Sequence, residues 1–134
     1  AKDTTVYVLA NSGTASASEA LIGALVCYGY LDYGNIYLSD YGEEYINWLT
    51  ETEQEVKTAQ TYGKGIMQST FVKRDTGEAL KLTTAQIYWP DGKTCIHDRG
   101  LRVEDGCKTV SADWVMEKGD PELRAAVEKI KSSL

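Results

Sequence analysis

The sequence predicts an α/β domain with a mixed β-sheet and packed helices. Three features of the 134-residue chain support this fold class. A β-rich run leads through a hydroxyl-rich turn into an amphipathic helix, two later strands are joined by a tight turn, and a capped helix follows. Alternating strand and helix followed by locally paired strands is typical of an α/β protein.

The first helix is the central element of this prediction. A β-rich run, Thr4 to Ala10, precedes a helix that begins at Ala17, with Ser16 at the N-cap and Glu19 three residues on, as in a capping box. Apolar residues at steps of three and four predict the buried stripe, namely Ala17, Ala20, Leu21, Ala24, Leu25 and Tyr28. The residues alone favour a helix cap at Ser16. The alternative is a nucleophile, because a helix N-terminus favours developing negative charge.

The middle of the chain is acidic and is predicted to hold a short strand and a surface helix. Asn35 to Leu38 fit a strand. Within the acidic stretch Asp40 to Gln60, apolar residues recur at helical spacing, namely Tyr45, Trp48, Leu49 and Val56. Such a charge run is usually a solvated face, and a lid over a cleft is the alternative.

A lysine between two glycines and a hairpin follow. Glycines on both sides of Lys64 allow a close approach of its backbone to another element, whereas a plain turn with an exposed lysine is the alternative. Ser69 to Val72 and Ala79 to Trp89 fit two strands joined across residues 74–77. A turn at Pro90–Gly92 ends the second strand.

The C-terminal third is predicted to contain short strands and a helix. Thr94 to Ile96 and Thr109 to Val110 fit strands. Asp120 is a suitable N-cap for a final helix with Pro121 in its first turn. The predicted packing face of that helix is formed by Leu123, Ala126, Val127 and Ile130.

The composition of the chain argues against nucleic-acid binding and against a membrane-spanning helix. The formal net charge of −6 argues against nucleic-acid binding, because no basic stripe is present to neutralise phosphates. The longest uncharged, mainly apolar run, Ala20 to Leu31, is shorter than the roughly 20 residues that span a bilayer. The chain opens without an initiating Met or a signal sequence, so we expect a piece of a longer protein.

The cysteines and the single histidine give no metal motif. Cys27 is expected to be a buried free thiol, and a disulfide between Cys95 and Cys107 is left open. His97 has no partner at metal-ligand spacing, so neither a metal nor a cofactor is expected. Because His97 lies in a polar loop beside Asp98, we expect a surface histidine rather than a member of a Ser-His-Asp triad. A serine nucleophile would then need another base, and lysine is a known substitute.

Three blocks of the sequence together resemble the carboxy-terminal processing, or tail-specific, serine peptidases. They are TASASEALIGAL (14–25), YGKGIMQ (62–68) and GEALKLTTAQIYWPDGK (77–93), and they occur in the family's order. The resemblance implies a Clp-peptidase/crotonase-like α/β fold. It also implies that residues 1–134 are the C-terminal portion of the catalytic domain, with the N-terminal half and a PDZ domain elsewhere.

The resemblance also implies a Ser–Lys mechanism. Its nucleophile corresponds to Ser16, its general base to Lys64 and the residue that orients this lysine to Gln68, whereas Ser18 is a non-catalytic neighbour. Half of the oxyanion hole corresponds to the backbone N–H of Ala17. The other half comes from an upstream glycine outside this chain, so we expect the chain alone to be inactive.

The proposed base has a physical requirement. A lysine must be neutral when it takes a proton, although its free pKa is near 10.4, and burial in a dry cleft favours the neutral form. In an extended strand Lys64 and Gln68 would lie roughly 13 Å apart, so a contact between them requires a turn.

The sequence departs from the family pattern in two places. Residues 31–58 are interpreted as carrying an insertion of roughly twenty residues between nucleophile and base. The family's late Pro-Asp signature is replaced around Leu101 to Cys107, which leaves the final strand pairing open.

The resemblance implies partners and a location as well. Members cleave protein or peptide substrates near the C-terminus, often presented as an added strand, and act outside the cytoplasm. A homo-oligomer is left open. The alternative is a non-catalytic ligand-binding protein on the same fold, which would need none of Ser16, Lys64 and Gln68 in their roles.

Overall fold

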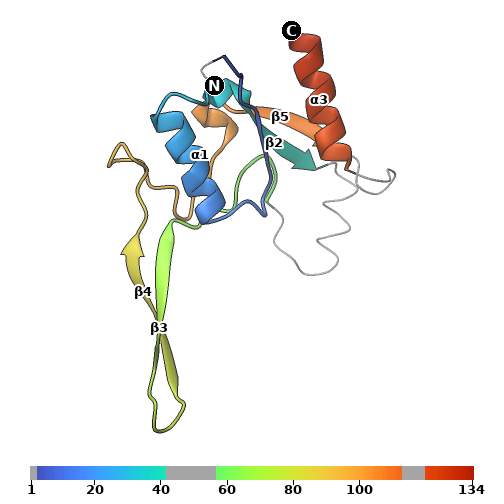
Figure 1. The fold of residues 1–134 in the computed structure, drawn as a ribbon. Helices are drawn as coiled ribbons and strands as arrows, with labels where there is room; N and C mark the ends of the chain where they lie inside the picture. Colours follow the sequence, from blue (N-terminus) through green and yellow to red (C-terminus); the bar gives the residue numbers. More distant parts are fainter. Residues whose placement is uncertain (1–2, 42–56, 113–119) are drawn as a thin grey trace.

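A three-stranded parallel sheet lies at the centre of the computed structural model, which describes residues 3–41, 57–112 and 120–134 (Figure 1). Its strands are β1 (Val8–Ala10), β2 (Ile36–Tyr41) and β5 (Lys108–Ala112), in the order β1–β2–β5. Both neighbouring pairs are parallel. The strand that follows the first helix, β2, is therefore the central one.

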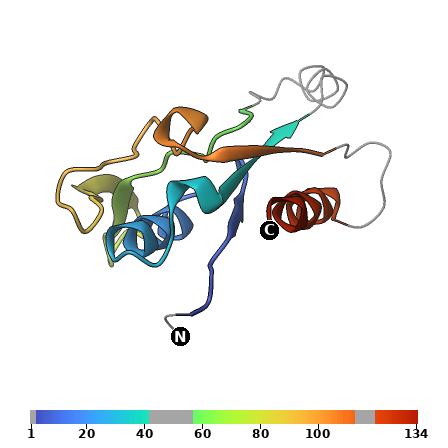
Figure 2. The ribbon, with the colours of Figure 1, turned by 90° about the horizontal axis from the view of Figure 1, so that it is seen from above.

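Two α-helices cover opposite faces of this sheet. They are α1 (Ala17–Cys27) and α3 (Pro121–Ser133), which flank β1 in the view from above (Figure 2). Ile36 and Leu38 of β2 belong to the cluster on the α1 side, whereas Tyr37 packs in the cluster that contains Ala126 of α3. This alternation is the two-residue period of a strand that is covered on both faces. Short 3₁₀ turns lie at Tyr33–Asn35 and Val103–Asp105.

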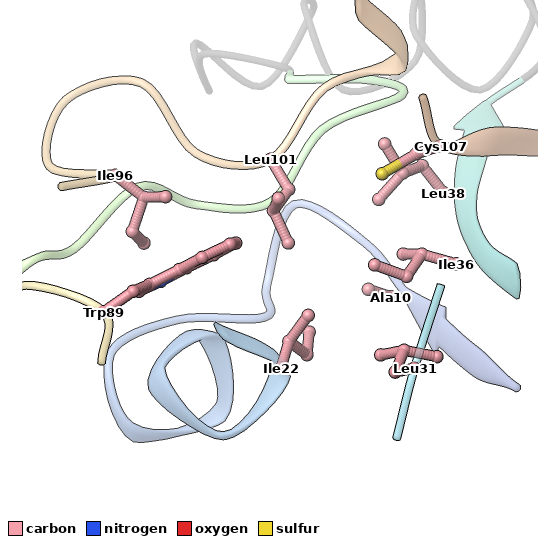
Figure 3. Packing of buried hydrophobic residues seen from close by; sticks show 9 residues of the cluster. All are labelled: Ala10, Ile22, Leu31, Ile36, Leu38, Trp89, Ile96, Leu101 and Cys107. Carbon is pink, nitrogen blue, oxygen red and sulfur yellow. The ribbon is translucent and has the colours of Figure 1, made fainter. Parts of the chain in front are cut away.

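The main core lies between the sheet, α1 and the loops after residue 88 (Figure 3). Trp89 lies over Gly23 of α1, and a Cβ atom at Gly23 would be only 2.4 Å from the indole ring. Tyr33 stacks on the same indole with ring centroids 6.4 Å apart. Glycine at position 23 therefore lets the segment around Trp89 pack directly on α1. The nine core residues are Ala10, Ile22, Leu31, Ile36, Leu38, Trp89, Ile96, Leu101 and Cys107.

An antiparallel hairpin projects from this body (Figure 1). It consists of β3 (Ile66–Val72) and β4 (Ala79–Gln86), which form a separate two-stranded sheet. The register shifts between Met67 and Gln68, since Met67 lies opposite Ala85 but Gln68 lies opposite Thr83. Such an irregularity bends a strand and changes the direction of its side chains. The register shift in β3 lies beside Gln68, which is a predicted site residue.

The α/β class is confirmed, with the parallel and antiparallel pairings of the described residues in separate sheets. The predicted turn at residues 74–77, the helix start at Ala17 and the N-cap at Asp120 are also confirmed; Asp120 accepts the Leu123 N–H at 3.0 Å. Five strand predictions had wrong bounds. β1 is shorter than Thr4 to Ala10, β2 extends to Tyr41, and β4 ends at Gln86. β3 begins at Ile66 rather than Ser69, and β5 is longer than Thr109 to Val110. Residues 94–96 form no strand.

The predicted buried stripe of α1 is wrong in part, since Leu25 packs against the main core but other members of the stripe are exposed. Leu21 and Tyr28 are 61% and 69% exposed, and the buried residues of this helix are Glu19, Ile22 and Gly23. The helical periodicity predicted that the most apolar side of α1 is buried. In the structure the buried side of α1 is the one on which Gly23 lies against Trp89 and Glu19 accepts a hydrogen bond from the loop around Lys64.

The cysteine predictions need correction. Cys27 is exposed, and Cys95 and Cys107 are both free thiols, so no disulfide joins them. Cys107 packs in the main core, where burial raises the pKa of its thiol to about 11. Its chemical role in this fold is that of a small apolar side chain.

The proposed insertion and the acidic helix lie largely outside the described residues. Within 31–58, β2 is the central strand of the sheet, while residues 42–56 are not described. The insertion, the acidic helix and its role as a lid therefore remain predictions.

Candidate active site

One pocket of about 480 Å³ contains all the predicted site residues. It lies where the start of α1 meets the beginning of the β3–β4 hairpin. Its lining is formed by Ser16, Ala17, Ala20, Lys64, Ile66, Met67, Gln68, Lys81 and Ile87. The structure thus brings together four residues that are up to 52 positions apart in the sequence. Within the described chain, no direct hydrogen bond joins the Ser16 and Lys64 side chains.

Ser16 has a strained backbone. Its φ and ψ angles are 53° and −113°, whereas an ordinary N-cap has an extended backbone. Positive φ is uncommon outside glycine and costs on the order of 1–3 kcal/mol, and such strain clusters at functional sites. A serine on a sharp strand-to-helix turn presents its hydroxyl at the helix N-terminus. The capping box predicted for Ser16 and Glu19 is present, and the role of Ser16 as a nucleophile stays a prediction.

The N–H of Ala17 is available to an oxyanion. Ala17 is the first residue of α1 and lines the pocket beside Ser16. No acceptor for its N–H is found among the described residues. A free N–H at a helix N-terminus is a suitable donor to developing negative charge.

Glu19 connects the serine turn to the lysine loop. Its carboxylate is 0% exposed, and Oε1 accepts the backbone N–H groups of Ser16 and Lys64, each at 3.0 Å. Oε2 accepts the Thr61 hydroxyl at 2.6 Å and the Gly63 N–H at 3.0 Å. The capping box predicted the first of these bonds only. Because one buried carboxylate holds both segments, their relative position is fixed by charge-assisted hydrogen bonds.

The lysine loop is also held by backbone contacts. Tyr62 N–H donates to the Thr14 carbonyl at 2.9 Å, which joins the loop directly to the serine turn. A Cβ atom at Gly63 would lie 2.8 Å from the Gly100 nitrogen, and one at Gly65 would lie 2.9 Å from the His97 nitrogen. The predicted close approach at the flanking glycines is therefore confirmed. The segment it approaches is 97–100.

His97 supports the lysine loop rather than the pocket. Its side chain is 27% exposed, so the expectation of a surface histidine is corrected to a half-buried one. Nδ1 accepts the Gly65 N–H at 3.3 Å, and Nε2 lies 3.5 Å from the Asp98 carboxylate. His97 does not line the pocket, so the geometry gives no support to a Ser-His-Asp triad. The spacing of residues in the sequence gave no indication of the hydrogen bond between Gly65 and His97.

An ion pair stabilises the segment that follows. The Arg99 guanidinium donates two hydrogen bonds to the Asp105 carboxylate, at 2.6 and 2.9 Å. Burial by itself raises the pKa of Asp105, but the bonds from Arg99 and from the Arg102 N–H outweigh it and hold the pKa below its usual value. This pair orders the stretch where the family's Pro-Asp signature is replaced.

The described residues contain neither a metal site nor a membrane-spanning helix. No group of three or more His, Cys, Asp or Glu side chains is placed to hold a metal ion. In the same part of the chain, no helix has the length and apolar character needed to cross a membrane.

Comparison with known proteins gives relatives that are named as serine proteases. The chain is 33% identical over 102 residues to a Staphylococcus aureus protein named "Probable CtpA-like serine protease", and 33% identical over 109 residues to a Staphylococcus epidermidis protein of the same name. These alignments cover 76% and 81% of the chain. The chain spans only 16% and 17% of the length of these curated relatives. No family model and no solved structure matches the chain. The homologues' names support a relationship between this chain and carboxy-terminal processing proteases.

Proposed function

We propose that this chain is the C-terminal portion of the catalytic domain of a carboxy-terminal processing serine endopeptidase. Ser16 is the nucleophile, Lys64 the general base, Gln68 the residue that orients Lys64, and the Ala17 N–H one half of the oxyanion hole. The observation that carries the proposal is the shared pocket, together with the Glu19 carboxylate that accepts from both Ser16 and Lys64. The upstream half of the domain would supply the second oxyanion donor.

The reaction follows from these positions. Neutral Lys64 takes the Ser16 hydroxyl proton as Oγ attacks the scissile carbonyl carbon, and the Ala17 N–H donates to the resulting oxyanion. Collapse of the tetrahedral intermediate breaks the C–N bond, and Lys64 gives its proton to the leaving amine. Lys64 then deprotonates a water molecule that attacks the acyl-enzyme, the ester C–O bond breaks, and Lys64 returns the proton to Ser16 Oγ. No cofactor takes part in the proposed steps.

The proposal extends to substrates and location. Substrates are protein or peptide chains cleaved near the C-terminus, and the enzyme acts outside the cytoplasm, as a periplasmic, secreted or membrane-anchored protein. A PDZ domain lies elsewhere in the full-length protein. The similarity to CtpA-like serine proteases supports this extension.

Single and double substitutions in the full-length protein test the mechanism. Ser16→Ala and Lys64→Ala should each lower kcat/KM for an unfolded protein substrate by at least about a thousandfold. Because the two residues act as one unit, the double variant should be little worse than either single variant. Ser18→Ala is the matched control, since Ser18 is exposed on the same turn of α1 and should retain activity. Robust turnover by Lys64→Ala would overturn the mechanism.

A further inference from the structure

A second lysine lines the same pocket from the other strand of the hairpin. Lys81 lies on β4 opposite Thr70 of β3, and the next pair on this face is Thr83 with Gln68. Since residues two apart on a strand share a face, Lys81 and Gln68 are on the same side of the hairpin. Both line the pocket with Ser16 and Lys64.

The pocket carries two lysines and no acidic side chain. None of its nine lining residues is Asp or Glu, although the whole chain has a formal net charge of −6. The nearest carboxylate in the hydrogen-bond network, Glu19, already accepts from four donors. With Lys64 neutral, as the proposed mechanism requires, Lys81 remains as a cationic side chain with no neutralising acid among the lining residues, which makes this part of the pocket a favourable environment for an anion.

The ammonium group of Lys81 has no protein partner in the described part of the chain. By contrast, Lys73 on the same hairpin lies 3.9 Å from the Asp75 carboxylate, and Lys57 donates to the Tyr62 carbonyl. In the proposed mechanism Lys64 must be neutral when it acts, so it cannot be the lasting partner of an anion. Lys81 is therefore the cation of this pocket that is available to bind an anionic ligand.

We propose that Lys81 recognises a carboxylate of the peptide substrate beside the cleavage position. This rests on the proposed function, because the pocket is taken as the site of peptide cleavage. A lysine ammonium is a compact charge with three donors and pairs with a carboxylate without demanding a planar arrangement. The carboxylate is either the substrate's terminal group or an Asp or Glu side chain near the scissile bond, since both offer the same chemistry.

Matched peptides test the proposal in the full-length protein. One pair of quenched fluorescent peptides differs only in a free or amidated C-terminus. A second, amidated set replaces Gln by Glu at each position flanking the cleavage site. One carboxylate-containing peptide of these sets should show a kcat/KM about tenfold above that of its neutral counterpart. Preference for the free acid identifies the terminal group, and preference for internal Glu identifies a side chain.

Substitutions then assign the preference to Lys81. Lys81→Met should abolish it, Lys81→Arg should keep it, and Lys73→Met, on the same hairpin but outside the pocket, should leave it unchanged. Lys81→Met lowering the rates of acidic and neutral peptides equally would overturn the proposal, because that result assigns Lys81 to the chemistry or to the fold. Equal rates for acidic and neutral peptides in the unaltered protein would also overturn it.

A binding measurement separates this inference from the catalytic one. In the Ser16→Ala protein, anisotropy of the same peptides should show the carboxylate preference and its loss with Lys81→Met. If Ser16 proves non-catalytic but this preference persists, the proposed function fails while carboxylate recognition by Lys81 stands. If peptides are cleaved through Ser16 but bind without this preference, the inference about Lys81 is wrong.

Discussion

At the scale of single residues, the buried carboxylate of Glu19 explains how the serine and the lysine are held. A buried charge is stable only when it is paired or hydrogen-bonded, and Glu19 accepts four donors. Three of them are backbone N–H groups, of Ser16, Gly63 and Lys64. Glu19 is a positioning residue, because it reaches the reaction only through these segments.

Glu19→Gln should therefore impair both stability and activity. An amide offers one acceptor oxygen and one NH₂ group, so at least one N–H of the lysine or serine segment would lose its acceptor. We expect a loss of about 3 kcal/mol in the free energy of unfolding and a lower kcat below the melting temperature. Chemical denaturation and turnover measure the two effects. Glu122→Gln, at a buried carboxylate of α3 outside the pocket, is the control and should lower stability alone. Unchanged kcat in Glu19→Gln would contradict the positioning role.

At the scale of elements, the lysine loop is placed by close backbone packing against residues 97–100. Gly63 has a φ angle of 87° and lies against Arg99 and Gly100, whereas Gly77 in the hairpin turn has a φ angle of 72° and open space around it. The two glycines thus share a positive φ angle and differ in their contacts. Substituting each of them in turn therefore separates the effect of backbone strain from the effect of steric displacement.

Gly63→Ala and Gly77→Ala should differ in their effect on activity. Both substitutions introduce the positive-φ penalty of about 1 kcal/mol. Only alanine at Gly63 must also displace the backbone at Gly100, so it should lose more stability and move Lys64 away from Ser16. We expect Gly77→Ala to retain turnover and Gly63→Ala to lose most of it, as measured below both melting temperatures. Equal turnover of the two variants would show that the loop tolerates displacement.

The sequence predicted the elements with strong local signals. The cap at Asp120, the glycine turn at residues 74–77 and the helix from Ala17 each depend on neighbouring residues only. The buried side of α1 depended on Trp89, which is distant in the sequence, so periodicity predicted it only in part. For the site, resemblance selected Ser16, Lys64 and Gln68, while the role of Glu19 beyond a cap required the fold to bring Thr61 and Lys64 to α1.

At the scale of the whole molecule, the core is held by packing without a disulfide between Cys95 and Cys107. Cys107 is buried between the sheet and the surrounding loops, and Cys27 is exposed. These surroundings give the thiols different reactivities, because the thiolate is the reactive form and burial disfavours it.

Thiol chemistry and alkaline unfolding check this description. Intact mass should be unchanged by reductant, and iodoacetamide should modify Cys27 well before Cys107.

Burial raises the pKa of Cys107 from 9.0 to about 11, so the folded state binds the proton more tightly than the unfolded state. Stability is then fully retained below about pH 9 and falls by up to about 3 kcal/mol as the pH rises through about 11. A shallower loss in Cys107→Ala would assign the effect, because the half-buried Tyr33, whose pKa is also raised, remains in both proteins. A gain of two hydrogens on reduction would contradict the free thiols.

Covalent labelling of the full-length protein tests the central claim most directly. A fluorophosphonate reacts only with an activated serine hydroxyl, and peptide mapping locates the label. The account predicts a single label on Ser16 that is retained in Ser18→Ala and lost in Lys64→Ala. A label on another serine, or labelling of Ser16 that persists without Lys64, would contradict a Ser–Lys active site in this pocket.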